Sequence, residues 1–238
     1  LGIKPGDEII TTPFTFISTA ETIAFLGAIP VFVDIDKKTY NIDITKIEEK
    51  INKQTKAIIP VSLFGQISDM DAINTIALKY NLSVIEDGAQ SFGATYKKKK
   101  SCNLSIIGTT SFFPAKPLGC FGDGGAVFTN DDDLAEKMKS MRIHGQTERY
   151  HHKYIGMGGR LDTLQATVLN VKIKHYDNDI LRRQKVAKNY TEKLKTKVIV
   201  PVVEKYNTSV WAQYSIRVRN RDKIQSSLKD KGIPTTVR

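Results

Sequence analysis

The 238-residue sequence has few cysteines and no long apolar runs. Its two cysteines, Cys102 and Cys120, do not belong to a C-x-x-C pair, which disfavours a disulfide framework and a zinc site and indicates a reducing, cytoplasmic location. We expect no membrane-spanning helix, and the first 20 residues lack the basic and apolar regions of a signal peptide. The 40% hydrophobic and 26% charged residues are typical of a globular chain with a core of its own.

Acidic residues are outnumbered by basic ones, 25 to 36, which gives a formal charge of +11. The excess is scattered, apart from a run of four lysines at residues 97–100 between two strand-like stretches, which is typical of a solvated turn. No recognisable nucleic-acid module accompanies the charge, so nucleic acid is not an expected partner. A nucleic-acid binder remains an alternative that a steep salt dependence of DNA binding would reveal.

Strand and helix patterns alternate through the first half of the chain. We expect strands at residues 7–11, 29–34, 57–63 and 83–87, and helices at residues 15–27, 43–52 and 69–80, the last with Ser68 as its N-cap. Strands separated by helices of this length indicate crossover connections. The sequence therefore predicts an α/β fold with a mainly parallel sheet.

The second half has a different pattern. Strand-like residues 106–113 and 125–129 flank a glycine-rich loop, and a helix is expected to start at residues 131–133, where acidic side chains suit a helix N-terminus. A helical pattern covers residues 161–194, followed by an alternating strand at 211–219 and a short helix at 221–231. Residues 1–6 resemble the end of a helix and residues 234–238 the start of a strand, so we expect a piece of a longer protein.

One lysine lies in a window that suits covalent chemistry. Lys116 follows an apolar strand, stands between Pro114 and Pro117, and precedes four glycines at residues 119–125. Prolines restrict the backbone and glycines allow a ligand to approach it closely, and a partly desolvated lysine can form a Schiff base with a carbonyl. Taken alone, a loop lysine is more often only solvated, and the glycine run does not match a dinucleotide-binding motif.

A carboxylate is expected at the edge of the same sheet. Asp87 ends a predicted parallel strand, where open α/β sheets bind their ligands, although it could equally cap a following helix. Lys116 and Asp87 together match the needs of pyridoxal 5'-phosphate, whose aldehyde takes a lysine and whose pyridinium nitrogen takes an acid.

Six motifs in order along the chain resemble those of the DegT/DnrJ/EryC1/StrS sugar aminotransferases. They are TPFTF at residues 12–16, VDID at 33–36, EDGAQSFGA at 86–94, SFFPAK at 111–116, GDGGA at 122–126 and RLDTLQA at 160–166. The resemblance implies the fold type I, aspartate aminotransferase-like architecture, with a mainly parallel seven-stranded-type sheet flanked by helices. It also implies a large cofactor-binding domain over residues 1–170, and a linking helix and the start of a small α+β domain over residues 171–238.

The resemblance implies a role toward pyridoxal 5'-phosphate for each of five residues. Lys116 would bind the cofactor aldehyde and later move the proton of the reaction. Asp87 would pair with the ring nitrogen, and Gln90 would contact the ring hydroxyl. Phe16 would stack on the ring, and Ser111 would bind the phosphate through its hydroxyl.

Two further segments, SLFGQ at residues 62–66 and RYHH at 149–152, resemble one branch of this family. That branch aminates a UDP-2-acetamido-2-deoxy-3-keto-hexuronic acid, with L-glutamate as donor, for surface polysaccharide synthesis such as that of O-antigen and lipopolysaccharide. It implies a cytoplasmic homodimer with L-glutamate and a UDP-keto-sugar as substrates. Arg160 would bind a substrate carboxylate, reaching into the neighbouring subunit's site, but a simple pairing with Asp162 at the helix start is equally open.

Three departures from the family pattern keep alternatives open. The family's Ser-Gly-Thr phosphate loop would lie before residue 1, a histidine- and proline-containing segment would follow residue 238, and Gly158 stands where relatives often carry an asparagine. A 4-keto-6-deoxy-sugar aminotransferase and a non-catalytic regulatory or binding relative are the alternatives. A dehydratase is disfavoured because Lys116 is present.

Overall fold

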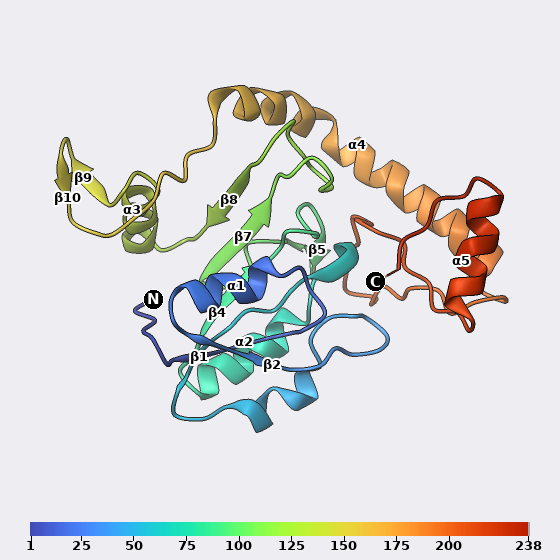
Figure 1. Ribbon diagram of the computed structural model, residues 1–238, viewed down its shortest axis with the longest axis horizontal. Helices are drawn as coiled ribbons and strands as arrows, with labels where there is room; N and C mark the ends of the chain where they lie inside the picture. Colours follow the sequence, from blue (N-terminus) through green and yellow to red (C-terminus); the bar gives the residue numbers. More distant parts are fainter. Residues whose placement is uncertain (238) are drawn as a thin grey trace.

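The computed structural model describes residues 1–237 and has a six-stranded sheet at its centre (Figure 1). Its strands are β1 (Glu8–Thr11), β2 (Ile29–Phe32), β3 (Thr55–Ile58), β4 (Ser83–Asp87), β7 (Ile107–Ser111) and β8 (Gly125–Phe128), in the spatial order β2-β1-β3-β4-β7-β8. All neighbours pair in parallel except β8, which is antiparallel to β7. This confirms the predicted mainly parallel α/β fold, although the sheet has six strands rather than seven.

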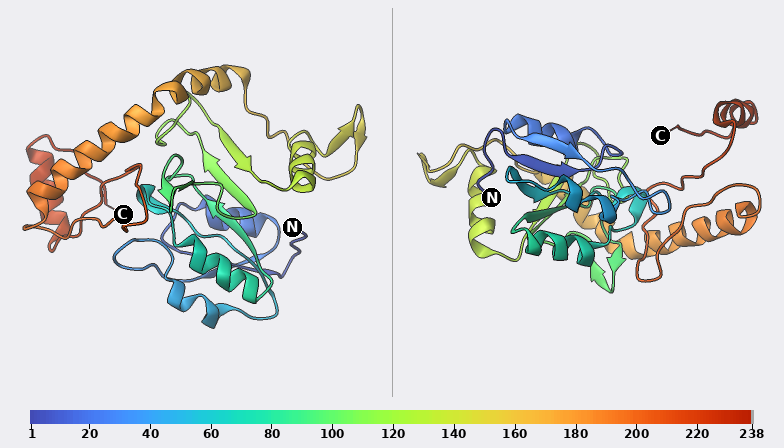
Figure 2. Two further views of the ribbon diagram at one scale, coloured as in Figure 1. Left: turned by 180° about the vertical axis from the view of Figure 1, so that it is seen from behind. Right: turned by 90° about the horizontal axis from the view of Figure 1, so that it is seen from below.

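Helices cover both faces of the sheet. Helix α1 (Ser18–Phe25) lies on one face and α2 (Met70–Lys79) on the other (Figure 2, right). Helix α2 begins after Asp69, whose carboxylate accepts a hydrogen bond from the Ala72 N–H at 3.2 Å. The expected N-cap, Ser68, is wrong, because its buried hydroxyl donates instead to the Val61 carbonyl at 3.2 Å.

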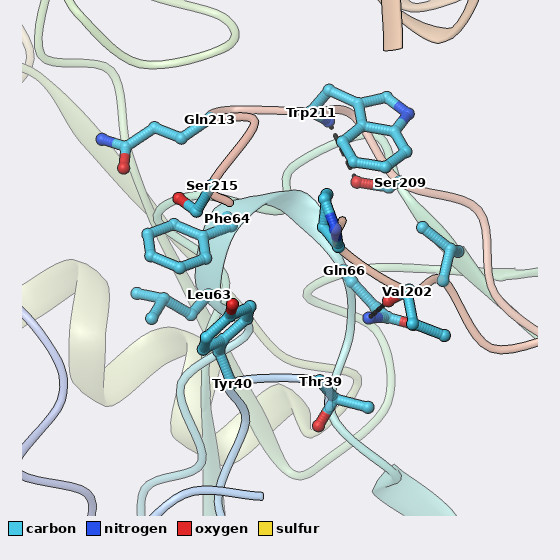
Figure 3. A pocket seen from close by; sticks show the side chains of 12 residues that line it. Thr39, Tyr40, Leu63, Phe64, Gln66, Val202, Ser209, Trp211, Gln213 and Ser215 are labelled. Atoms are coloured by element: carbon cyan, nitrogen blue, oxygen red, sulfur yellow. Dashed lines mark hydrogen bonds between the residues drawn. The ribbon is translucent and has the colours of Figure 1, made fainter. Parts of the chain in front are cut away.

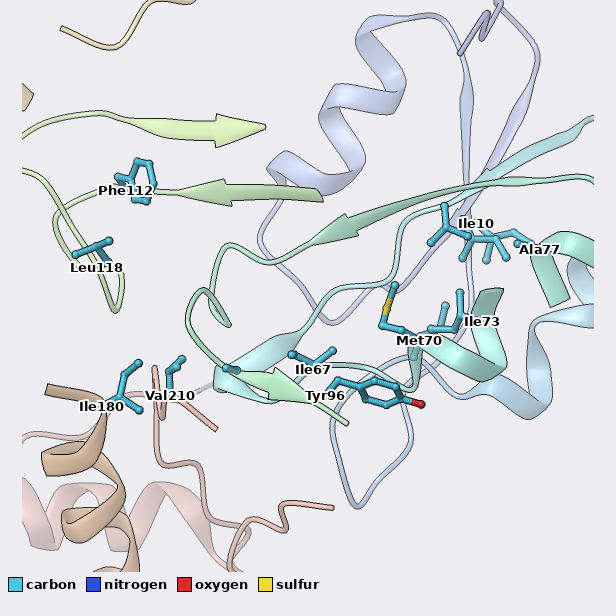
Figure 4. Close-up of a cluster of buried hydrophobic side chains, with 14 of the residues drawn as sticks. Ile10, Ile67, Met70, Ile73, Ala77, Tyr96, Phe112, Leu118, Ile180 and Val210 are labelled. Atoms are coloured by element: carbon cyan, nitrogen blue, oxygen red, sulfur yellow. The ribbon is translucent and has the colours of Figure 1, made fainter. Parts of the chain in front are cut away.

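The apolar core lies between α2 and the sheet (Figure 4). Ile10 of β1 and Ile73 of α2 are both fully buried, and burying such an aliphatic side chain contributes about 1.5–3 kcal/mol. The same cluster continues through Phe112 and Leu118 to Ile180, far along the chain. This continuous packing holds the strand ends, and thereby the residues that follow them, in place.

Three expected elements differ most between the sequence prediction and the structure. The helix expected at residues 43–52 is a pair of single 3-10 turns, η1 (Ile44–Lys46) and η2 (Glu48–Lys50). The strand expected at 57–63 leaves the ladder after Ile58 and returns to it only in an isolated bridge between Val61 and Asp87. The strand expected at 211–219 is reduced to one bridge at residue 217, and residue 211 has a φ of +50°.

Two short hairpins extend from the sheet. One is formed by β5 (Thr95–Tyr96) and β6 (Lys99–Lys100), and Lys97 and Lys98 make the turn between them with φ values of +47° and +71°. The predicted solvated turn is therefore confirmed for Lys97 and Lys98, whereas Lys99 and Lys100, also exposed, form β6. The other hairpin is formed by β9 (Gln146–Glu148) and β10 (His151–His152), next to α3 (Asp132–Met141) (Figure 1).

The last part of the chain is dominated by α4 (Thr163–Leu194), which confirms the expected long helix, and ends with α5 (Arg221–Asp230) (Figure 1). Residue 170 lies inside α4, and the domain division expected there remains a prediction. Residues 233–237 form no strand, and residue 238 lies outside the described residues. Within residues 1–237, no helix combines the length and apolarity needed to cross a membrane.

Candidate active site

The carboxyl ends of β4 and β7 lie side by side at the carboxyl edge of the sheet, the side at which its parallel strands end. Asp87, the last residue of β4, pairs in register with Thr109, and Ser111 ends β7 two residues later. The Gly88 N–H donates to the Thr109 carbonyl at 2.8 Å, and the Thr110 hydroxyl donates to the Gly88 carbonyl at 3.1 Å. The two strand ends are thus joined where open α/β sheets bind their ligands.

The half-buried carboxylate of Asp87 is held from two sides. The Thr19 hydroxyl donates to Oδ2 at 2.8 Å, and the Ala89 N–H donates to Oδ1 at 3.1 Å. Residues 89–93 form turns, so no helix begins after Asp87. The alternative in which Asp87 only caps a helix is therefore wrong. Thr19, which the sequence analysis did not single out, fixes this carboxylate from α1.

Gln90 follows Asp87 and is oriented by a distant turn. The Phe64 N–H donates to Gln90 Oε1 at 3.0 Å. Because the amide oxygen accepts this bond, the NH₂ group is the part of Gln90 that can donate to an anionic oxygen. The contact of Gln90 with a ring hydroxyl stays a prediction, which this NH₂ group is chemically able to make.

The turn that orients Gln90 is η3 (Leu63–Gly65), in which Phe64 has a φ of +57°. The Phe64 ring packs edge-on against the Tyr40 ring, with centroids 5.4 Å apart. Both rings lie beside the segment that carries Trp211 (Figure 3). The Val210 N–H donates to the Gly65 carbonyl at 3.0 Å and fixes the turn. The cavity between these segments is about 20 Å³, enough for one water molecule and too small for a sugar.

Lys116 is half-buried in the loop between β7 and β8. Its N–H donates to the Phe113 carbonyl at 2.8 Å, which turns the chain back after the strand. A Cβ at Gly119 would lie 2.6 Å from the Pro114 carbonyl oxygen, so only glycine fits this close return. The tight loop keeps Lys116 close to the strand end that carries Ser111.

Helix α4 holds the same loop from outside. Gln165 Oε1 accepts a hydrogen bond from the Phe121 N–H at 2.8 Å, and Lys172 Nζ donates to the Gly119 carbonyl. Neither role was identified from the sequence. A polar side chain on the face of a helix that points back to the sheet is the only signal that could have suggested them.

Phe16 and Ser111 complete the set predicted to face a cofactor. Phe16 is 65% exposed just before α1, and its carbonyl accepts the Thr19 N–H at 3.2 Å, which joins it to the group that holds Asp87. Ser111 is half-buried and its oxygen accepts the Phe113 N–H at 3.2 Å. An exposed aromatic ring, a carboxylate, a hydroxyl and a primary amine therefore come from elements that meet at one sheet edge.

Arg160 lies outside this group. Its side chain is exposed between the β9–β10 hairpin and α4, and no ion pair joins it to Asp162 among the described residues. The alternative pairing at the helix start is therefore not formed. A Cβ at Gly158 would lie 3.3 Å from the His144 ring, so a larger residue there requires that ring to move.

Glu86 precedes Asp87 and points to the opposite face of β4, as alternation along a strand requires. It is fully buried and accepts hydrogen bonds from the Ser101 hydroxyl and the Cys102 N–H, both at 2.8 Å. Burial raises the pKa of the Glu86 carboxyl above its ordinary value, and these hydrogen bonds oppose the rise. Glu86 thus helps to hold the strand ends in place from within the protein and does not face the side on which Asp87 lies.

Comparison with known proteins identifies the family of this chain. The model of the DegT/DnrJ/EryC1/StrS aminotransferase family matches residues 1–238. The UDP-2-acetamido-2-deoxy-3-oxo-D-glucuronate aminotransferase of Pseudomonas aeruginosa is 57% identical over 238 residues, which are all of this chain and 66% of that protein. The pleiotropic regulatory protein of Geobacillus stearothermophilus is 48% identical over 99% of this chain and 64% of its own length.

Solved structures show the same fold. The crystal structure of a DegT DnrJ EryC1 StrS aminotransferase from Brucella abortus superimposes with a TM-score of 0.94 at 42% identity and covers 99% of this chain and 65% of that one. The chain therefore spans just under two thirds of the length of the relatives it matches.

Proposed function

Because this chain belongs to the DegT/DnrJ/EryC1/StrS aminotransferase family, we propose that it forms the cofactor-binding part of a pyridoxal 5'-phosphate-dependent aminotransferase. The amino group moves from L-glutamate to a keto nucleotide-sugar, UDP-2-acetamido-2-deoxy-3-keto-glucuronic acid, in the synthesis of surface polysaccharide such as O-antigen. The choice of sugar is supported by the 57% identity with the Pseudomonas aeruginosa aminotransferase.

The observation that carries this proposal is the position of Asp87. Its carboxylate ends β4, receives one hydrogen bond on each oxygen, and adjoins the strand end from which Ser111 and the Lys116 loop follow. The donor set fits the cofactor, since it offers an acid for the ring nitrogen, a hydroxyl for the phosphate and an amine for the aldehyde. When bound, the cofactor supplies an electron sink for the substrate carbon from which the proton is removed.

Lys116 is the residue that carries out the chemistry in this proposal. Its amine would hold the cofactor through the aldehyde. Once free, Nζ would accept the proton from the α-carbon of the amino donor, which requires a neutral amine. The same Nζ would return a proton in the half-reaction with the keto-sugar.

The remaining residues of the edge bind and orient. Asp87 keeps the ring nitrogen protonated, Gln90 donates its NH₂ to the ring oxygen, and Ser111 donates its hydroxyl to the phosphate. Phe16 offers its exposed ring as a stacking surface. Each of these four side chains thus has the charge, hydrogen-bonding group or ring that its proposed contact with the cofactor needs.

The substrate side of the proposal involves a second copy of the chain in a cytoplasmic homodimer. Arg160 is exposed and suits bidentate binding of the sugar carboxylate across the interface. Nearby Ile155, Met157 and Leu164 are 94%, 71% and 80% exposed, and an apolar surface of this kind favours a partner.

A visible absorbance spectrum of the purified protein with added pyridoxal 5'-phosphate tests the proposal. We expect a band from the lysine-bound cofactor, and L-glutamate should bleach it, whereas D-glutamate should not. A band that L-glutamate leaves unchanged would favour a binding or regulatory protein, the role named for the Geobacillus stearothermophilus relative. A protein that forms no band with the cofactor would contradict the proposal.

A further inference from the structure

Thr19 connects α1 to the carboxylate of Asp87 across 68 residues of sequence. Its side chain is buried, with 5% exposure, in the first turn of the helix. The hydroxyl donates to Asp87 Oδ2 at 2.8 Å and also lies 3.0 Å from the Thr15 hydroxyl. A threonine hydroxyl has one proton, which Thr19 gives to the carboxylate, so Thr15 is the donor in the second contact. The chain of donation runs from Thr15 through Thr19 to Asp87.

We propose that Thr19 is a positioning residue that fixes the Asp87 carboxylate for its partner on the cofactor ring, an inference that rests on the function proposed above. The Ala89 N–H holds Oδ1 and Thr19 holds Oδ2, so rotation of the carboxylate about its Cβ–Cγ bond breaks both contacts. Two ionised oxygens have about four acceptor sites, so two remain for an N–H of the ring. The carboxylate is thus held in place before the ligand arrives, and this limits the cost of ordering it.

The rest of α1 shows that this hydroxyl is not used by the helix itself. Thr22, three residues later, donates its hydroxyl to the Ser18 carbonyl of the same helix at 2.9 Å, a common arrangement for threonine. The N-cap position, Ile17, makes no side-chain capping bond. Thr19 alone among these threonine and cap residues directs its proton out of the helix to β4, so its contribution is to Asp87.

Three variants separate this role from a general effect on α1. Thr19→Val removes the hydroxyl at nearly constant volume, Thr19→Ser keeps it, and Thr22→Val is the matched control on the same helix. We expect Thr19→Val to weaken pyridoxal 5'-phosphate binding and to lower kcat, each on the order of tenfold, because a hydrogen bond to a charged group is lost. KM for L-glutamate should change less than about twofold. Thr19→Ser should restore the wild-type values, and Thr22→Val should match them.

A cofactor analogue with carbon in place of the ring nitrogen, 1-deazapyridoxal 5'-phosphate, gives a readout independent of turnover. If Thr19 acts through Asp87 and the ring nitrogen, wild type and Thr19→Val should bind the analogue with equal affinity. An equal loss of affinity for both cofactors would show a merely structural role and overturn the inference. If Thr19→Val unfolds, Thr19→Ala, which cannot overfill the site, takes its place.

The two proposals fail in different ways. A wild-type protein that forms no visible band contradicts the proposed function and this inference with it. A wild-type protein with the expected band, whose Thr19→Val variant behaves as Thr22→Val does, contradicts only the role of Thr19.

Discussion

The edge of the sheet and the segment from α3 to the start of α4 differ in how much geometry the chain itself supplies. At the edge, Asp87 and Gln90 are each held by hydrogen bonds from distant elements, and the loop after β7 is fixed by α4. In the outer segment, Arg160, Tyr150 and Ile155 project from the surface, the last two with exposures of 79% and 94%.

This difference indicates a division of tasks within the proposed reaction. One chain provides a preorganised place for the cofactor, since the hydrogen bonds that hold the side chains of Asp87 and Gln90 come from the same chain. The side chains proposed to receive the sugar have no such support within residues 1–237. Substitutions at the edge should therefore change cofactor binding and kcat. Substitutions in the outer segment should change only the KM for the keto-sugar.

The largest effect is expected from Lys116→Ala. Without the amine, the visible band should disappear and transamination should fall by about a thousandfold or more, since the nucleophile and the proton carrier are both lost. Spectra and turnover of the variant measure this. Lys98→Ala, in the exposed turn between β5 and β6, is the control and should behave as wild type. Continued amination of the sugar by Lys116→Ala would show that another residue is the nucleophile.

Asp87→Asn should have the next largest effect. The amide keeps the size of the side chain but removes the charge that holds the ring nitrogen protonated, so kcat should fall roughly a hundredfold. The band should persist, because Lys116 still binds the aldehyde, but with altered intensity and pH dependence. Asp133→Asn on the exposed side of α3 serves as the matched control. A kcat within about twofold of wild type would argue against the pairing of Asp87 with the cofactor.

The outer segment gives the contrasting prediction. Arg160→Ala should raise KM for the keto-sugar about tenfold, because a bidentate carboxylate contact is lost, and should leave the cofactor band unchanged. Steady-state kinetics with varied sugar and a spectrum of the same preparation test both halves. Arg182→Ala, an exposed arginine later on α4, is the control. A loss of the band in Arg160→Ala would show that the two regions are not separate in function.

The sheet was largely predictable from the sequence because buried parallel strands are short apolar runs with clear ends. The turns at residues 43–52 were not, since Ile44, Ile47 and Ile51 recur at spacings of three and four that a 3-10 turn and an α-helix share. The alternation at residues 211–219 predicted a strand, but within residues 1–237 its pairing is limited to the single bridge between Ile199 and Arg217. The residue pattern of a segment does not show whether another strand lies beside it to form the hydrogen bonds of a sheet.

The same limit applies to the site. Lys116 and Asp87 lie in motifs whose chemistry is visible over a few residues. Thr19, Phe64 and Lys172 act on those motifs from 68, 26 and 53 residues away, measured to the residues they contact, and only the fold brings them there. The sequence therefore predicts candidate reactive groups, and the groups that hold them became visible only in the fold.

The smallest effect is expected beneath the edge, at Glu86. Its pKa lies above the ordinary value of 4.5 in the folded protein, so between these two values the folded state binds more protons than the unfolded state. Wild-type stability should consequently decline as pH rises from 4.5 through the folded pKa. Glu86→Gln does not titrate and can still accept the Cys102 N–H, so it removes this decline.

Urea unfolding of wild type and Glu86→Gln at several values between pH 4 and pH 8 measures the difference. The free energy of unfolding of the variant should gain on that of wild type as pH rises. The cofactor band should stay unchanged, because Glu86 faces away from the open side of the edge. A constant difference across this range would mean that Glu86 titrates alike in both states, and its burial would then be compensated fully by its hydrogen bonds.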